Sequence, residues 1–429
     1  MQRLFLGTVL HFLSDPGAEP APGSWQLFED GALLVENGKV MRVGDAATLR
    51  ADQAPSTEIV DHRGKLILPG FVDTHVHSAQ LDVIASYGTQ LLDWLTRYTF
   101  PSERRFEDAD HGARMANMFL DRLLASGTTT ASVYPTVHKQ SAETFFAAAD
   151  ARNMRMLAGK ILMDRNCPGY LRDDVISAEV DCRDLIQRWH GKGRLGYSLT
   201  PRFAPTSTPA QLAMAGRLFN EVPGLHLQSH LAENVHEIKW VHELFPDRRS
   251  YLDVYDHFGL LGGRAIYGHC IHTDAADRAR MAETRTAIAF CPSSNLFIGS
   301  GLFDFEQAKA AGIRVGLASD VGGGTSLSML QVMADAYKVL QLKGQHLNPW
   351  RAFYLATLGG AEALSLDAHI GNFMPGKEAD FTVLDFAAIP ILKHRADIAR
   401  DFAERLFALM ILGDDRAVAA TYVLGERAF

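Results

Sequence analysis

The chain has 429 residues, of which 47% are hydrophobic and 21% charged, an ordinary balance for a globular protein with a large core. Its 42 Lys and Arg face 50 Asp and Glu, and a formal net charge of −8 provides no field for gathering a polyanion. No apolar run in the sequence approaches the roughly 18 residues that span a bilayer. Collagen-like, disordered, coiled-coil and membrane classes are therefore excluded, and we expect neither nucleic acid nor a membrane as a partner.

The four cysteines are scattered and include no C-x-x-C pair, so their spacing indicates neither a disulfide framework nor a thiolate zinc site. Isolated thiols in a chain of this size favour a reducing compartment. The apolar stretch at residues 4–13 resembles the core of a signal peptide, but Gly7 and His11 interrupt it and no small-x-small cleavage site follows. We interpret this stretch as a first β-strand and expect a cytoplasmic protein.

Both ends of the chain are rich in short β-type runs. Near the N-terminus, an Asn-Gly dipeptide at 37–38 lies between two such runs, which is the strongest short signal of a β-hairpin. Similar runs recur near the other end, at 380–384 and 421–424. We expect the two ends, residues 1–65 and 371–429, to pair into one small β-sandwich domain.

Between these ends, residues 66–370 alternate short apolar strands with amphipathic helical stretches. The helix predicted at 209–219 has Thr208 as its N-cap and Pro209 in its first position. Eight strand-then-helix units in about 300 residues have the size of a (β/α)8 barrel, an α/β fold. A doubly wound sheet is the alternative, but no G-x-G-x-x-G follows the first strand. The expected strands lie at 66–72, 128–134, 155–163, 194–199, 225–228, 265–267, 286–290 and 313–318, with further helices at 235–244 and 305–311.

The sharpest motif is His75-Val76-His77, which directly follows the apolar strand at 66–72. Residues i and i+2 of a strand point to the same face, so His75 and His77 project side by side. At the end of a barrel strand this face is the interior, where two imidazoles can bind one divalent cation. A pair of histidines in a surface turn is the alternative, but the position after an apolar strand favours a metal site.

Three further predicted strands lead into side chains that bind metals or transfer protons. Each of these strands ends at or just before one such side chain, namely His230, His269 or Asp320. Taken alone, Asp320 is equally suited to capping a helix N-terminus. Barrel active sites form at the C-terminal ends of the strands, so we expect these three side chains to gather near His75 and His77.

This order of motifs resembles the amidohydrolase superfamily of metal-dependent hydrolases. Residues 94–106 are similar to the W-L-x-x-Y-T-F-P-x-E-x-R-F segment of the guanine deaminases, which is far more specific than H-x-H. The resemblance implies hydrolysis of guanine to xanthine and ammonia in purine catabolism, with guanine and water as substrates. It continues through residues 160–164, 200–203, 228–233, 319–323 and 376–381, and so spans nearly the whole chain.

The resemblance also implies a role for each candidate residue. Glu233 matches the acid–base carboxylate, although a first-turn acid favoured by a helix dipole is also consistent with its position. His269 and Asp320 would assist it beside the metal. The fourth barrel strand offers no lysine to bridge two ions, which implies one ion per chain: zinc, with iron(II) as the alternative. The implied metal ligands are His75, His77, His230 and Asp320, the implied substrate contacts are Gln80, Arg202 and Phe203, and the implied assembly is a homodimer.

Alternatives remain at this point for both the function and the substrate contacts. Related barrels deaminate other heterocycles or dechlorinate triazines, although residues 94–106 together with Arg202 and Phe203 favour guanine. A catalytically silent scaffold is another alternative, but loss of ligands marks that fate and here they are present. Arg202 is otherwise a salt-bridged loop residue and Phe203 a core residue. We interpret Trp94 as a core residue, and a position in a lid over the pocket is the alternative.

Overall fold

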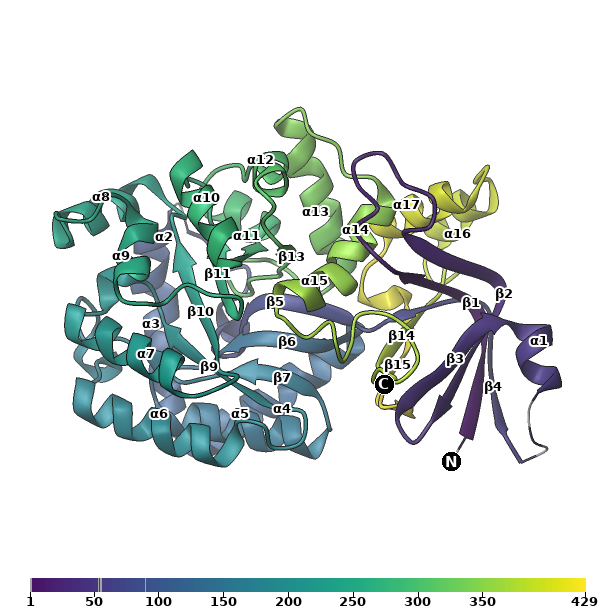
Figure 1. The fold of residues 1–429 in the computed structure, drawn as a ribbon, viewed down its shortest axis with the longest axis horizontal. Helices are drawn as coiled ribbons and strands as arrows, with labels where there is room; N and C mark the ends of the chain where they lie inside the picture. Colours follow the sequence, from purple (N-terminus) through teal and green to yellow (C-terminus); the bar gives the residue numbers. More distant parts are fainter. Residues whose placement is uncertain (1, 53, 55, 89) are drawn as a thin grey trace.

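The structure is a computed structural model that describes residues 2–52, 54, 56–88 and 90–429, and it consists of a barrel beside a separate β-sheet (Figure 1). Eight parallel strands follow one another in the order β5-β6-β7-β9-β10-β11-β12-β13, and β8 pairs with β9. The expected α/β class and (β/α)8 barrel are thereby confirmed. The strands are β5 (Phe71–His77), β6 (Thr128–Tyr134), β7 (Arg155–Ala158), β8 (Ile161–Leu162), β9 (Gly196–Pro201), β10 (His226–Leu231), β11 (Ala265–His269), β12 (Ala287–Phe290) and β13 (Val315–Leu317).

Hydrogen bonds between the first and last strands close the barrel. The Thr74 hydroxyl donates to the carbonyl of Leu317 at 2.9 Å. Just beyond the end of β13, the backbone N–H of Asp320 donates to the carbonyl of His75 at 2.9 Å. This closure fixes the strand end that carries His75 directly beside Asp320.

Helices surround the barrel and bury one face against it. The helix predicted at 209–219 is α7, where the Thr208 side chain accepts from the N–H of Gln211 and Pro209 stands in the first turn. In the described part of the chain, no helix is both long enough and apolar enough to cross a membrane. The helices are α1 (Ala46–Ala51), α2 (Leu91–Trp94), η2 (Leu95–Thr99), α3 (Phe100–Arg104), α4 (Ala109–Ala125), α5 (Lys139–Ala151), α6 (Val175–Trp189), α7 (Pro209–Glu221), α8 (Val235–Leu244), α9 (Tyr251–His257), α10 (Ala275–Thr284), α11 (Pro292–Phe297), α12 (Phe305–Ala310), α13 (Met329–Leu342), α14 (Pro349–Leu355), α15 (Leu358–Ala363), α16 (Pro390–Asp397) and α17 (Phe402–Leu412), with shorter turns η1 (Ser78–Val83), η3 (Arg105–Glu107), η4 (Gly169–Leu171), η5 (Ala204–Thr206) and η6 (Asp415–Ala417).

Strands from both ends of the chain form one seven-stranded mixed sheet beside the barrel (Figure 1). The Asn-Gly dipeptide makes the predicted hairpin turn, with positive φ angles of 50° at Asn37 and 76° at Gly38, which this turn type requires. The sheet runs in the order β16-β15-β14-β4-β1-β2-β3 and comprises β1 (Gln2–Phe12), β2 (Trp25–Glu36), β3 (Lys39–Asp45), β4 (Glu58–Pro69), β14 (Phe381–Leu384), β15 (Val418–Val423) and β16 (Glu426–Arg427).

The strand expected at 66–72 is in fact two strands. Its first part ends β4 at Pro69 in the terminal sheet, and its last part begins β5 at Phe71 in the barrel. The two meet at Gly70, where a Cβ atom would come within 2.1 Å of the Thr129 hydroxyl. Both parts are buried, so a continuous apolar run gives no sign of where the chain passes from one sheet to the other. The run expected at 155–163 likewise divides into β7 and β8.

A buried ion cluster joins the segment before β14 to the barrel. The Glu378 side chain is 6% exposed and accepts from Arg155 Nε at 2.8 Å and from Arg194 Nη2 at 2.7 Å. Arg194 also pairs with Asp380. Burial alone would raise the pKa of Glu378, but the two guanidinium groups lower it to about 2.

Replacing Glu378 with Gln is expected to lower the free energy of unfolding at pH 7 by about 3 kcal/mol, since it leaves the largely buried Arg155 guanidinium without its anion and Arg194 with Asp380 alone. The pKa of Glu378 is lowered in the folded state, to about 2, so its contribution is complete above the unfolded value near 4.5 and declines as the pH falls toward 2. Urea unfolding of wild type and Glu378→Gln at pH 7 and pH 3 should show the difference shrinking at the lower pH.

The matched control is Glu221→Gln, which removes an exposed ion pair with Arg183. This variant should unfold as the wild type does. An equal loss of stability in both variants, or a loss for Glu378→Gln that does not shrink at pH 3, would contradict the expectation.

Candidate active site

The side chains singled out in the sequence meet at the C-terminal ends of the barrel strands. Most of them line one cavity, whose empty space, including its open mouth, is about 420 Å³. Apolar walls come from α2, η2 and the loop after α11. The lining residues are His77, Gln80, Leu91, Trp94, Leu95, Arg202, Phe203, His230, Glu233, Glu237, His269, Ser294, Ile298, Asp320 and Gly323.

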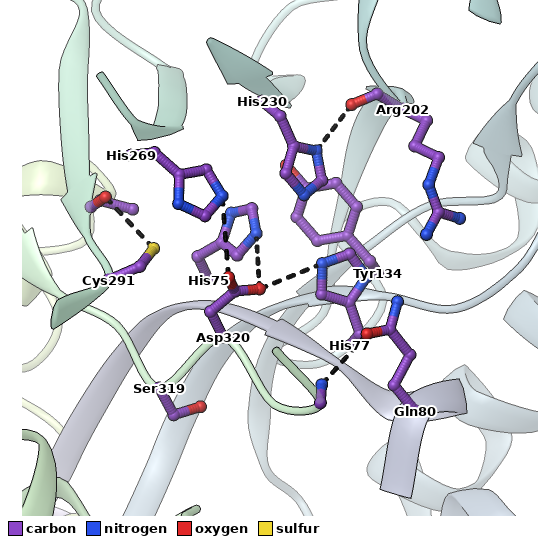
Figure 2. Close-up of polar contacts among 12 residues, drawn as sticks. His75, His77, Gln80, Tyr134, Arg202, His230, His269, Cys291, Ser319 and Asp320 are labelled. Atoms are coloured by element: carbon purple, nitrogen blue, oxygen red, sulfur yellow. Dashed lines mark hydrogen bonds and ion pairs between the residues drawn. The ribbon is translucent and has the colours of Figure 1, made fainter. Parts of the chain in front are cut away.

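Imidazoles gather around the carboxylate of Asp320 at the bottom of this cavity (Figure 2). The Nε2 atoms of His75 and His77 each lie 3.3 Å from Asp320 Oδ1. The Nε2 atom of His269 lies 3.7 Å from Oδ2 of the same carboxylate. The ring of His230 completes the group, with its centroid 4.7 Å from that of His75. The structure therefore brings together all five side chains that the sequence placed at strand ends.

Two of the histidines are oriented by a hydrogen bond at the far ring nitrogen. Nδ1 of His230 lies 2.7 Å from the carbonyl of Arg202, and Nδ1 of His269 lies 2.8 Å from Oδ1 of Asn295. Each bond leaves Nε2 for the centre of the cluster. A hydrogen bond at the ring nitrogen that faces away from the metal is typical of metal-ligating histidines, because it fixes both the tautomer and the ring orientation.

The backbone at the strand ends is bent to aim these side chains inward. His269 and Asp320 have φ angles of 70° and 48°, a left-handed conformation that costs free energy in a residue with a side chain. Behind them, the buried Asp73 carboxylate accepts from the N–H of Ser319 at 3.0 Å. At Gly268, a Cβ atom would come within 2.8 Å of the His75 ring, so only glycine leaves room for this imidazole.

The electrostatics of the cluster favour neutral imidazoles at His77 and His230 and an ionised carboxylate at Asp320. Burial lowers the pKa of His77 to about 3 and holds the pKa of His230 well below its usual value. Burial alone would raise the pKa of Asp320, but the neighbouring histidines, with His75 first, hold it well below its usual value. Neutral imidazole nitrogens and an ionised carboxylate are the ligand forms that a divalent cation requires.

The donor set fits one divalent metal ion. Ligand atoms of His75, His230, His269 and Asp320 all lie within 4.8 Å of one another. His77 stands outside that group of four, although its Nε2 reaches Asp320 as closely as that of His75 does. The Nε2 atoms of His75 and His269 are buried without a hydrogen-bond partner among the described residues, as expected of lone pairs directed at a cation.

Glu233 lies at the edge of the cluster, in the loop after β10. Its side chain is 2% exposed, with Oε2 3.3 Å from His269 Nε2 and Oε1 accepting from the Ser300 hydroxyl at 2.9 Å. Burial, and after it the charge of Asp320, raises the pKa of Glu233 to about 8. This carboxyl group can therefore hold a proton or release it near neutral pH.

Gln80 and Arg202 lie together on one side of the cluster (Figure 2). Gln80 follows β5 and accepts from the N–H of Gly322 at 3.1 Å, whereas Arg202 follows β9. Phe203 also lines the cavity, so it is not simply a core residue. Trp94 lines it as well, with its indole N–H donating to the carbonyl of Ser86.

Several residues of the site carry no motif that marks them in advance. Ser300 reaches Glu233 from a loop 67 positions away, and Asn295 orients His269 from the first turns of α11. Glu237 accepts from the backbone N–H of Glu233 at 3.1 Å. Its spacing three residues after Asn234 is a capping-box signal that sequence inspection could have used.

Comparison with known proteins places the chain in a family. Residues 66–428 match the amidohydrolase family. The match covers the barrel and the C-terminal strands of the terminal sheet, and with them each of the cluster residues described above. The chain therefore belongs to the amidohydrolase family.

Individual proteins are similar to this chain over nearly its whole length. The chain is 48% identical to the guanine deaminase of Escherichia coli K12, over 95% of this chain and 93% of that protein. The solved structure of E. coli guanine deaminase superposes with a TM-score of 0.96 at 45% identity, covering 100% of this chain and 99% of the other. A guanine deaminase from C. acetobutylicum with bound guanine in its active site superposes with a TM-score of 0.90 at 28% identity, over 100% of both chains.

The purified protein is expected to carry about one divalent metal ion per chain. Replacing His230 with Ala should lower the bound metal at least about tenfold, because even second-sphere changes cost 10–100-fold in metal affinity. Elemental analysis after dialysis against a weak chelator measures this directly.

His226→Gln is the matched control, since this buried histidine lies on the same strand but its Nε2 lies 3.1 Å from the carbonyl of Leu364, away from the cluster. The control should keep its metal. Full metal content in His230→Ala would show that the ion lies elsewhere in the protein.

Proposed function

We propose that this protein hydrolyses guanine to xanthine and ammonia. The observation that carries the proposal is one cavity in which the His–Asp cluster, the buried Glu233 carboxyl and the polar side chains of Gln80 and Arg202 all meet. The relatives named above are guanine deaminases, and they match this chain over nearly their whole length. They support the same reaction. Guanine bound in the active site of one of them supports the substrate.

In this proposal His75, His77, His230 and Asp320 hold one zinc ion per chain, and iron(II) is the alternative that the same donors accept. When bound, such an ion supplies Lewis-acid chemistry that makes water nucleophilic at neutral pH. Asp320 is the one carboxylate in the group of four possible ligands described above, and β9 (Gly196–Pro201) offers no lysine to bridge two ions. A single ion suits this set.

Glu233 carries protons through the reaction. It takes one from the attacking water and delivers it to the ring nitrogen beside C2, which makes C2 electrophilic. The water oxygen then bonds to C2, and the second proton of the water is accepted and oriented by Asp320 and His269. That second proton then passes from Asp320 through Glu233 to the amino group as the bond from C2 to that nitrogen breaks, so that ammonia leaves and the water oxygen stays on C2 as a carbonyl. The raised pKa of Glu233, about 8, suits a group that must both take and give a proton.

Substrate choice in this proposal comes from polar complementarity. Arg202 donates to the oxygen at C6, which guanine has and adenine lacks. Gln80 pairs with the ring edge, and Phe203 covers a face of the base. A base that leaves these buried polar groups unpaired is strongly rejected.

We also propose the wider setting that the family resemblance of the sequence implies: a homodimer that acts in purine catabolism in the cytoplasm. For the chain itself we propose a division into residues 1–65 and 371–429 as the terminal β domain and 66–370 as the catalytic barrel. The barrel boundary at 65/66 falls inside β4, whose last residues pair with β14 in the terminal sheet.

Glu233→Gln is expected to lower kcat for guanine by about 10²- to 10⁴-fold, because the amide cannot shuttle protons. The metal content should stay unchanged, since Glu233 lies outside the proposed ligand set. Ammonia release from guanine, adenine, cytosine and 8-oxoguanine, measured for wild type and variant, tests both the substrate and the proton carrier.

Glu243→Gln on the exposed face of α8 is the matched control and should retain full activity. Metal-loaded wild type that releases no ammonia from guanine would refute the proposed substrate. An active Glu233→Gln would refute the proposed proton carrier.

A further inference from the structure

Behind the cavity lining, the carboxylate of Glu103 accepts hydrogen bonds from Arg202 and Gln80, the two polar side chains that we propose contact the base. This residue belongs to α3, within the stretch at 94–106, and is fully buried. Its two oxygens accept from Arg202 Nη1 at 2.8 and 2.7 Å, and Oε1 also accepts from Gln80 Nε2 at 3.2 Å. Glu103 does not itself belong to the described residues that line the cavity. It touches the two side chains that do.

We propose that Glu103 is a positioning residue that sets substrate specificity by fixing the orientation of Arg202 and Gln80, an inference that rests on the proposed function. Its bonds use Nη1 of Arg202, so that Nε and Nη2 are left for a ligand. The guanidinium is further held over the ring of Phe100, with Cζ 5.4 Å from the centroid. Arg202 thus enters the cavity in a fixed pose rather than as a mobile cation.

The orientation of the Gln80 amide follows from its two neighbours. The backbone N–H of Gly322 can only donate, so the amide oxygen faces it at 3.1 Å. An ionised carboxylate can only accept, so the amide nitrogen faces Glu103. One amide N–H and one oxygen lone pair remain for the ligand, in places that Glu103 and Gly322 determine together.

The charge of Glu103 matters as much as its geometry. Arg202 is 2% exposed, so without an anion its positive charge would be buried and uncompensated beside a neutral base. Glu103 cancels that charge without touching the ligand. Because Arg202 and Gln80 face the part of the base that does not react, their misplacement should weaken ground state and transition state alike, which raises KM and leaves kcat nearly unchanged.

The test is Glu103→Gln, which keeps the size of the side chain but offers one acceptor oxygen in place of a charged pair. We expect KM for guanine to rise at least about tenfold while kcat changes less than about threefold. The preference for guanine over 2,6-diaminopurine, which bears an amino group in place of the oxygen at C6 and no hydrogen on N1, should also fall at least about tenfold. A purely structural role would lower the melting temperature and leave KM and this preference unchanged.

Asp173→Asn is the matched control, because it breaks another buried ion pair, with Lys160 Nζ at 2.7 Å, outside the cavity lining. This control should lose stability but keep the wild-type KM and preference. Should Glu103→Gln fail to fold, Glu103→Asp gives the same test, since its shorter carboxylate cannot reach both partners and should also raise KM.

An unchanged KM and an unchanged preference in a folded Glu103 variant would overturn the positioning role. That result is distinct from failure of the proposed function, which would appear first as wild type that releases no ammonia from guanine. The two claims are therefore decided by separate measurements on the same preparations.

Discussion

The burial of the Asp320 carboxylate among the imidazoles of the cluster is the constraint on which the rest of the structure depends. A buried carboxylate is costly unless positive charge compensates it, and the pKa values of His77 and His230 are too low for protonated imidazoles to provide that charge near pH 7. In our proposal a divalent cation supplies that charge, with the imidazoles as its further ligands. The inward-bent backbone at His269 and Asp320 and the glycine at 268 are features that bring these groups into one place.

Buried polar groups around this centre orient the side chains that our proposal places in catalysis. Asn295 and the carbonyl of Arg202 orient two histidines, and Ser300 holds the carboxyl of Glu233. In our proposal Glu103 orients Arg202 and Gln80 in the same way. Each acts on a group that would touch metal or substrate, without reaching either itself. The last residues of the barrel strands thus carry the four histidines, and the segments after the strands carry Gln80, Arg202, Glu233 and Asp320.

Local signals in the sequence predicted the barrel, the terminal hairpin and the strand-end residues, because strand periodicity places His75 and His77 on one face and barrel topology gathers strand ends. The division of the run at 66–72 could not be predicted, since its apolar residues are buried in both sheets. Ser300 carries no local signal either, since its contact with Glu233 spans 67 positions of the chain. Glu103 lay within a recognised stretch, yet only the structure shows which side chains it holds.

The most direct test of this account is a crystal structure of the metal-loaded Glu233→Gln variant with guanine, with anomalous scattering used to place and identify the ion. We expect one ion about 2.0–2.2 Å from nitrogen atoms of His75, His77 and His230 and from an oxygen of Asp320. The guanine should lie with its C6 oxygen toward Arg202. An ion bound away from Asp320, or guanine bound with its reacting carbon turned away from the cluster, would contradict the account.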